Sequence, residues 1–235
     1  LKRICQSMAE VAKEAGVQIV TGDTKVVNRG HGDGIYINTS GVGIVREGLN
    51  LSGANCKPGD KVLVSGTLGD HGITIMSCRE GLNFKTDIQS DAAPLNHLIA
   101  SVIEAAPNTR CFRDPTRGGI ASTLNELAAQ SDVDITIEEQ AVPVKDAVLG
   151  ACEMLGYDVF QVANEGKMVC VVPPEEADSA LTAMRNDRYG KDAAIIGEVI
   201  EAKNADSGCK VYLKTAFGST RILDMLVGEQ LPRIC

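Results

Sequence analysis

From residue 61 onwards, short apolar runs alternate with stretches of helical periodicity. The run Lys61–Ser65 (KVLVS) predicts a buried strand, and the apolar stripe within 95–103 predicts an amphipathic helix. Neighbouring strand-like runs, such as Ala194–Ile200 and Lys210–Leu213, have no helix-length segment between them. Consecutive parallel strands need a crossover connection, which is usually a helix. The pattern therefore predicts an α+β (mixed α/β) fold.

The other predicted elements continue this alternation. Because the chain has no Trp and 3% aromatic residues, aliphatic side chains and alanine must fill the core between them. We predict further helices beginning at Ile73, after Gly119, over Val144–Leu155 and over Glu175–Met184, and further strands over Asp134–Glu138 and Lys167–Val172.

The first fifty residues or so are turn-rich. Residues 3–15 repeat apolar side chains at helical spacing and Gly16 follows as a stop signal. The runs Val17–Val20, Ile35–Asn38 and Val42–Val45 predict strands. The chain opens with Leu1, and no N-cap residue precedes the helical pattern, so we expect further residues upstream of Leu1 in a longer protein.

The sequence suggests one boundary and one tail. The stretch 50–60 contains two glycines and a proline and has no periodic pattern, which is typical of a linker. After Asp224 the chain has no room for another packed element, and Pro232 disfavours one. We therefore predict an N-terminal part (1–52), a C-terminal α+β domain (53–223) and a flexible tail (224–235).

Charge and cysteine content exclude several classes of protein. The formal net charge of −8 disfavours nucleic acid and anionic membranes as partners. The eight cysteines form no CxxC pair, which argues against a zinc ribbon or a dithiol redox site. Scattered thiols are typical of a reduced compartment, so we expect a cytoplasmic protein. No apolar run reaches the roughly 18–20 residues that span a bilayer.

Three loops place glycine beside an acid, after or near a predicted strand. They are Gly22–Lys25 (GDTK), Gly69–Gly72 (GDHG) and Asp114–Gly119 (DPTRGG). Glycine lets backbone N–H groups approach a phosphate, a helix start adds positive potential, and carboxylates hold Mg²⁺. Each loop alone is better explained as an ordinary turn. Together they indicate a site for a magnesium–nucleotide complex, although none is a Walker A pattern.

A fourth segment, Ala163–Lys167 (ANEGK), precedes the strand-like run KMVCVV. Glu165 beside a glycine at a strand edge is a candidate base. The alternative, which residue type alone favours, is a solvated turn in which Glu165 pairs with Lys167. Of the three histidines, only His71, next to Asp70, is a candidate for a site.

The cysteines differ mainly in their position along the chain. Cys5, Cys152 and Cys170 lie within helix or strand patterns and are predicted to be small core residues, and Cys111 is expected to be buried too. Cys235 is the terminal residue, where chains are usually mobile and exposed. An exposed terminal thiol is prone to oxidation, so we predict that Cys235 carries a group into the nucleotide site on a mobile arm.

The ending PRIC, together with TGDTKVV, SGTLGDHG, RDPTRGG and ANEGK in this order, closely resembles the HypE family of hydrogenase maturation proteins. HypE belongs to the superfamily of aminoimidazole ribonucleotide synthetase and selenophosphate synthetase. The resemblance runs from about Leu1 to Cys235 and implies the two-domain fold of that superfamily, with its N-terminal domain truncated. It implies that 1–52 is the remnant of an ATP-binding and dimerisation domain, and that the full-length protein is a homodimer.

The resemblance also implies a reaction. The carbamoyltransferase HypF would place a carbamoyl group on Cys235, and ATP with Mg²⁺ would drive its dehydration to a thiocyanate. The cyanide would then pass to iron on the HypC–HypD complex for the nickel–iron hydrogenase centre. The implied roles are magnesium binding by Asp23, charge neutralisation by Lys25, proton removal by Glu165, and ATP or phosphate binding by Asp23, Thr24, Asp70, Asp114, Arg117, Gly118 and Gly119.

Two other readings use the same residues. A superfamily kinase acting on a small molecule would need the glycine–acid loops but not Cys235. A catalytically incomplete fragment would only dock HypF or HypC–HypD through its tail.

Overall fold

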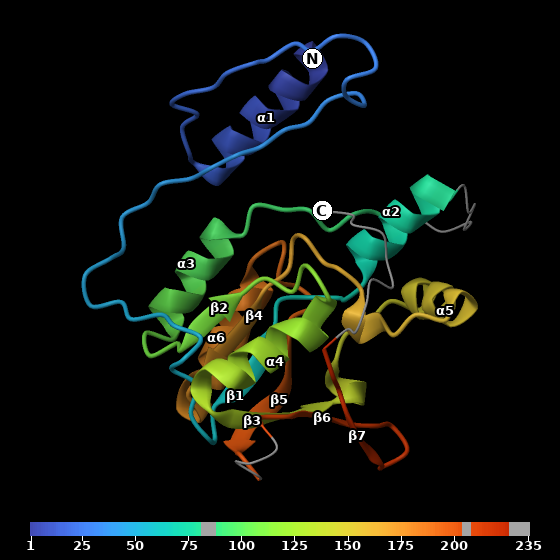
Figure 1. Ribbon diagram of the computed structural model, residues 1–235. Helices are drawn as coiled ribbons and strands as arrows, with labels where there is room; N and C mark the ends of the chain where they lie inside the picture. The colour runs from blue at the N-terminus through green and yellow to red at the C-terminus, as the bar shows by residue number, and fades with distance from the viewer. Residues whose placement is uncertain (81–87, 204–207, 226–235) are drawn as a thin grey trace. The chain divides into compact units, whose positions relative to one another are not determined.

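The computed structural model describes residues 1–80, 88–203 and 208–225 (Figure 1). The chain divides into two compact units, Leu1–Leu49 and Asn50–Cys235. The division predicted at residues 52 and 53 remains a prediction. No helix in the described part of the chain is long and apolar enough to cross a membrane.

The first unit contains a single described helix, α1 (Lys2–Ala15). Gly16 ends it in the left-handed conformation, with φ of 68°, and the backbone N–H groups of Gly16 and Val17 donate to the last turn. The predicted burial of Cys5 is wrong: Cys5 is exposed, because α1 has no buried face within this unit.

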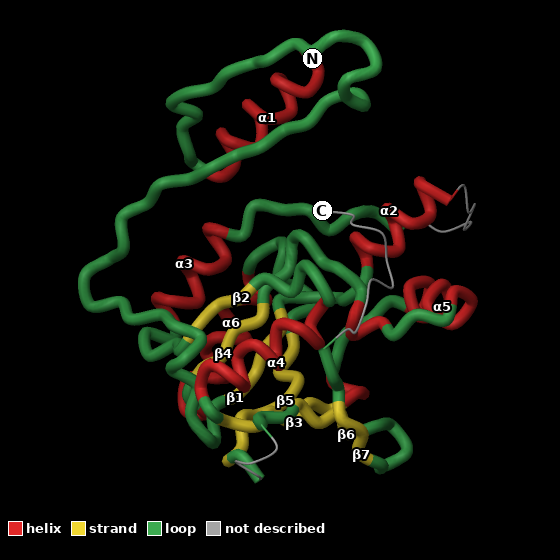
Figure 2. The backbone as a smooth tube through the Cα atoms, in the orientation of Figure 1, coloured by secondary structure: helices red, strands yellow, loops and turns green. Residues whose placement is uncertain are grey.

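The strands predicted within residues 17–45 are also wrong for this unit, where the described backbone is loop (Figure 2). Val20, Val42 and Ile44 are 84%, 104% and 99% exposed, respectively. A strand needs a hydrogen-bonded neighbour, and its apolar side chains need a surface to pack on. Neither is present within Leu1–Leu49, so the apolar alternation alone does not produce a sheet.

The second unit is built on a seven-stranded sheet with the order β2-β4-β1-β5-β3-β6-β7. Neighbouring strands are antiparallel except for the parallel pair β3 and β6. The prediction of a mixed α/β fold is confirmed. The strands are β1 (Lys61–Val64), β2 (Cys111–Arg113), β3 (Val133–Glu138), β4 (Val169–Val172), β5 (Ala194–Glu201), β6 (Val211–Lys214) and β7 (Thr220–Ile222).

Helices cover both faces of this sheet (Figure 1). They are α2 (Asp70–Glu80), α3 (Asn96–Ala105), α4 (Gly119–Ser131), α5 (Asp146–Leu155) and α6 (Ala177–Asn186), with short 3₁₀ turns at Glu139–Ala141, Val159–Gln161 and Pro174–Glu176.

The period-two pattern of β1 explains why two layers of helices form. Val62 and Val64 point into a core shared with Leu124 of α4, whereas Leu63 points into a second core shared with α3 and α6. All three β1 side chains are fully buried. Both faces of the sheet therefore hold an apolar layer, and α4 lies opposite α3 and α6.

Candidate functional site

Asn164 lies at the centre of the site because its buried side-chain amide fastens three segments together. The backbone N–H of Gly69 donates to its Oδ1 at 2.8 Å. Its Nδ2 donates to the carbonyl oxygens of Pro115 and Val162, both at 3.0 Å. Asn164 is 0% exposed, so these bonds are formed away from water. The Gly69 loop and the Pro115 loop are thereby held against the segment that contains Glu165.

Sequence analysis did not single out Asn164, although it belongs to the quoted ANEGK motif. A carboxamide has both donors and an acceptor, so it can satisfy N–H and C=O groups from different loops. Its position directly after the apolar residues Val162 and Ala163 was a usable signal of burial.

The Gly69–Gly72 segment is not a loop throughout, because α2 begins at Asp70 and not at Ile73 as predicted. Asp70 is 2% exposed, and its Oδ2 accepts hydrogen bonds from Thr67 Oγ1 and from Lys145 Nζ, the latter at 2.9 Å. A carboxylate in the first turn of a helix is stabilised by the helix dipole. Its Oδ1 is buried and has no hydrogen-bond partner within the described part of the chain.

Gly118 and Gly119 begin α4 as predicted, and both have positive φ, of 68° and 59°. A Cβ on Gly119 would lie 2.5 Å from the carbonyl oxygen of Phe160, so the close approach of the two backbones requires glycine. The first N–H groups of a helix have no partner inside it and are suited to an anion. The predicted phosphate-binding role of these glycines remains a prediction.

The charged residues that precede these glycines are more exposed. Asp114 accepts hydrogen bonds from Arg113 and from Thr116 Oγ1, and its side chain is 52% exposed. The hydrogen bond from Arg113 to Glu126 raises the pKa of that guanidinium above its ordinary value, and the charge of Asp114 adds to the effect. Arg117 is exposed. The proposed nucleotide contacts of Asp114 and Arg117 remain predictions.

The Glu165 segment is held by Asp91, which lies outside all four motifs. The backbone N–H groups of Glu165 and Gly166 donate to Asp91 Oδ1 at 3.0 Å and 3.2 Å. Lys167 Nζ lies 3.4 Å from Asp91 Oδ2, and both side chains are almost fully buried. The structure therefore pairs Lys167 with Asp91, and not with Glu165 in a solvated turn.

Five buried side-chain atoms of the described residues have no hydrogen-bond partner, and they gather around these segments. His71 is one of these residues, because its Nδ1 lies 2.8 Å from Ser90 Oγ while its Nε2 has no partner. A buried polar atom without a partner costs about 1–3 kcal/mol. Such a concentration indicates where a bound ligand would supply the missing partners. The atoms are Asp70 Oδ1, His71 Nε2, Asp91 Oδ2, Gln161 Oε1 and Glu165 Oε1.

The first glycine–acid loop belongs to the other unit. Within Leu1–Leu49, Asp23 and Lys25 are exposed, and the backbone N–H of Thr24 donates to Asp23 Oδ1 at 2.7 Å. The magnesium role of Asp23 and the roles of Thr24 and Lys25 remain predictions. Among the described residues, no three His, Cys, Asp or Glu side chains gather as a metal site. Cys235 lies outside the described residues.

Three cysteines of the second unit are core residues. Cys111, Cys152 and Cys170 are buried as predicted. Burial raises the pKa of Cys152 to about 11 and raises that of Cys170 still further. The contact with Cys56, together with burial, raises the pKa of Cys111. Thiols with raised pKa are poor nucleophiles, so none of these three is a candidate for carrying a group.

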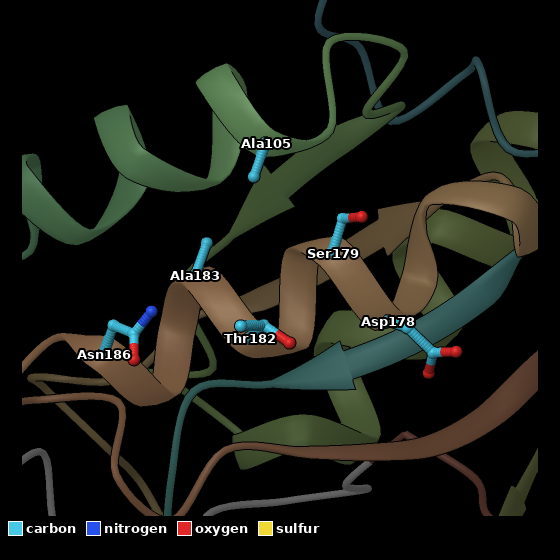
Figure 3. A pocket seen from close by; sticks show the side chains of 6 residues that line it. All are labelled: Ala105, Asp178, Ser179, Thr182, Ala183 and Asn186. Carbon is cyan, nitrogen blue, oxygen red and sulfur yellow. The ribbon is translucent and has the colours of Figure 1, made fainter.

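A separate hollow lies on the surface between α3 and α6 (Figure 3). It lies over the face of the sheet opposite α4, and its lining is small and polar, with one carboxylate. It contains none of the candidate residues. The lining side chains are Ala105, Asp178, Ser179, Thr182, Ala183 and Asn186.

Comparison with known proteins gives the same family over both units. Residues 57–210 match the model of the AIR synthase related protein, C-terminal domain, and residues 1–45 match that of the N-terminal domain. The carbamoyl dehydratase HypE of Azotobacter vinelandii is 54% identical over 235 residues, which is 100% of this chain and 68% of that relative.

Solved structures agree with this similarity. A chain in the crystal structure of a HypE–HypF complex is 52% identical, with a TM-score of 0.90 over 96% of this chain and 72% of that chain. A crystal structure of HypE in complex with ATP is 43% identical, with a TM-score of 0.87 over 99% of this chain and 70% of that chain.

Proposed function

The chain belongs to the HypE family of AIR synthase related proteins, and from this premise we propose that it acts in hydrogenase maturation as an ATP-dependent carbamoyl dehydratase. The substrate is an S-carbamoyl group on Cys235, and the product is a thiocyanate on the same sulfur. The observation that carries the proposal is the convergence at Asn164 of the Gly69–Asp70 segment, the Pro115–Gly119 loop and Glu165.

ATP supplies the phosphoryl group that turns the amide oxygen of the carbamoyl group into a leaving group. The bound nucleotide of a HypE structure that is 43% identical supports ATP as the co-substrate. Phosphoryl transfer depends mainly on positioning and on charge neutralisation, which backbone N–H groups and cationic side chains provide. Gly118 offers its N–H at the start of α4, whereas the N–H of Gly119 donates to the carbonyl oxygen of Thr116 at 3.1 Å and would have to exchange that bond for one to phosphate. Arg117 and Lys25 offer positive charge.

Glu165 removes the proton from the carbamoyl nitrogen. Its Oε1 is buried and has no hydrogen-bond partner among the described residues, so it is available to accept an N–H. A general base has to come within about 2.6–3.2 Å of the group that gives up the proton. The amide oxygen bonds to the γ-phosphorus of ATP as the bond to ADP breaks, and one N–H proton passes to Glu165. The C–O bond then breaks, and phosphate leaves with the second N–H proton, which converts the carbamoyl group to a nitrile.

Asp23 is the proposed magnesium ligand, with Asp70 and Asp114 as weaker candidates. Magnesium is usually held by one or two carboxylates together with substrate phosphates and water, so an all-protein cage is not required. Asp70 Oδ1 is the one buried carboxylate oxygen among these three residues that lacks a hydrogen bond in the described chain. The free Oδ1 of Asp70 therefore fits a metal that arrives with the nucleotide.

HypF is the proposed donor of the carbamoyl group, supported by the crystal structure of a HypE–HypF complex to which this chain is 52% identical. The proposed acceptor of the cyanide is the HypC–HypD complex. A homodimeric full-length protein and a cytoplasmic location are parts of the same proposal.

The test is to incubate the chain with HypF, carbamoyl phosphate and ATP and to measure the mass of the intact protein. The expected result is a gain of one carbamoyl group followed by loss of one water. If Cys235→Ala still gains the carbamoyl group, Cys235 is not its carrier. A wild-type chain that gains the group but never loses water is a docking fragment and not a dehydratase.

The role of Glu165 has its own matched pair of variants. Glu165→Gln should keep carbamoylation and block dehydration, because the amide cannot take up the proton. Glu153→Gln, a substitution of an exposed glutamate on α5, should dehydrate like the wild type. Normal dehydration by Glu165→Gln would remove Glu165 from the mechanism.

A further inference from the structure

Asp91 uses its whole carboxylate on the segment that carries Glu165. Its Oδ1 accepts two backbone N–H groups from this segment, and its Oδ2 faces Lys167 Nζ at 3.4 Å. The side chain is 2% exposed, so removing it from water has a cost, which the two N–H hydrogen bonds at Oδ1 and the ion pair with Lys167 offset. Lys167 makes no hydrogen bond to Oδ2, which has no hydrogen-bond partner among the described residues. Nothing in the four sequence motifs identifies Asp91, because its partners lie more than seventy positions later in the chain.

The contact between the two segments is also a close backbone contact. A Cβ on Gly166 would lie 1.7 Å from the carbonyl oxygen of Asp91 and 2.8 Å from the backbone nitrogen of Ala93. At its other end the Asp91 segment is attached to α2, because Ser90 Oγ is in hydrogen-bond contact with His71 Nδ1. The segment therefore connects the start of α2 with the main chain at Glu165.

Lys167 is the cation that lies nearest to Glu165 in the sequence. While Lys167 is paired with Asp91, Glu165 Oε1 remains without a hydrogen-bond partner among the described residues. If Asp91 lost its charge, Lys167 would be left buried and unpaired, which is strongly unfavourable. A lysine released in this way would pair with the carboxylate two residues away and neutralise it.

We propose that Asp91 is a positioning residue for the dehydration step: it fixes the main chain at Glu165 and keeps Lys167 away from the Glu165 carboxylate. This inference rests on the proposed function, in which Glu165 takes the amide proton. Asp91 itself does not contact the reacting group. It acts by leaving the Glu165 carboxylate in place and free of a competing cation.

The first test removes the charge of Asp91 and keeps its shape. Asp91→Asn retains an oxygen for the two N–H groups but no longer neutralises Lys167. On protein that HypF has already carbamoylated, the expected result is a single-turnover dehydration rate at least about tenfold lower, with carbamoylation unchanged. Asp192→Asn, at an exposed aspartate, is the matched control and should react like the wild type.

A rescue separates positioning from a merely structural role. The double variant Asp91→Asn/Lys167→Gln has no released cation, so it should recover most of the lost rate. A double variant as slow as Asp91→Asn would overturn the proposal, because the defect would then not arise from Lys167. An Asp91→Asn variant with the wild-type rate would overturn it too.

A second comparison covers the case in which Asp91→Asn does not fold. Asp91→Asn/Lys167→Gln and Asp91→Ala/Lys167→Gln both lack the ion pair, and only the first keeps the oxygen that holds the two N–H groups. The first should dehydrate at least about tenfold faster, and equal rates would overturn the proposal.

Failure of the proposed function gives a different result. If the wild-type chain does not dehydrate, the carboxyl ¹³C signal of Glu165 still reports the positioning. That signal should move in Asp91→Asn and return in Asp91→Asn/Lys167→Gln. An unmoved signal would overturn the role of Asp91 independently of the chemistry.

Discussion

The Gly22–Lys25 and Gly69–Gly72 segments share a glycine–aspartate pair but differ in their surroundings. Around Gly22 a Cβ would meet no atom within 4 Å, and Asp23 is exposed. Around Gly69 a Cβ would lie 2.7 Å from Val148, and Asp70 is 2% exposed. The difference shows that a glycine–aspartate pair is held in a fixed, buried position only when residues from distant parts of the chain pack against it.

The same contrast holds for the two units as wholes. In Leu1–Leu49 the described apolar side chains are largely exposed, whereas the second unit packs two apolar layers against one sheet. The same substitution should therefore lower the free energy of unfolding much more in the second unit than in the first. Four pairs of matched substitutions test this.

The largest effect is expected for glycine. Gly119→Ala puts a Cβ 2.5 Å from a backbone oxygen at a φ of 59°, and should cost about 4 kcal/mol of unfolding free energy. Gly22→Ala, with open space and no positive φ, should change it by less than about 0.5 kcal/mol. Urea unfolding measures both, and similar costs would contradict the contrast.

The second largest effect is expected for asparagine. Asn164→Ala leaves the Gly69 N–H without its acceptor and opens a small void. It should therefore lower the free energy of unfolding by about 3 kcal/mol. Asn28→Ala, in the exposed part of the first unit, should stay within about 0.5 kcal/mol. Thermal unfolding of the two variants checks this. If Asn164→Ala lowered the free energy of unfolding only slightly, the loops would not depend on this amide.

The third effect concerns valine. Val62 is 0% exposed and Val26 is 88% exposed. Val62→Ala should cost about 2 kcal/mol through lost burial and the cavity it leaves, whereas Val26→Ala should cost almost nothing. Equal costs in denaturant unfolding would mean that Val26 is buried in solution, for example against a second copy of the chain.

The smallest effect is an ion pair at the sheet surface. Lys61 donates to Glu198 at 2.7 Å and lowers the pKa of that carboxyl below its ordinary value, with both side chains partly exposed. A carboxyl group whose pKa is lower in the folded state stabilises the fold at pH values above its pKa in the unfolded state. That stabilisation is lost as the pH falls through the folded-state pKa. Lys61→Met should therefore cost less than about 1 kcal/mol at pH 7, and the cost should fade below about pH 4.5.

Stability curves against pH for Lys61→Met and for the exposed Lys13→Met, in α1, provide the comparison. Lys13→Met should show no such dependence. A cost for Lys61→Met that persists at low pH would rule out the ion pair as its cause.

Local sequence was sufficient to predict much of the secondary structure of the second unit, but little of that of the first. KVLVS, the helix after Gly119 and the burial of Cys170 follow from periodicity and residue type, which act over a few positions. The start of α2 at Asp70 was missed, because that carboxylate is held by Lys145, 75 positions away. The strands predicted in 17–45 failed for a related reason, since a strand requires a neighbour that its own sequence does not specify.

The candidate site divides in the same way. The motifs pointed to Glu165 and to the glycines at the start of α4, because those residues have recognisable local chemistry. Asn164 and Asp91 were not identified, because an amide and a carboxylate acquire their roles only from the backbone groups that they meet in the fold.

The hydrogen bonds of Asn164 also constrain the order in which the site can assemble. They join residues 95 and 49 positions apart, so both closures lose chain entropy before any contact stabilises them. During synthesis, the Gly69 and Pro115 loops lack this shared anchor until residue 164 has emerged and docked. These two loops are therefore expected to close late in folding and to open together, as one cooperative group, when the native protein fluctuates.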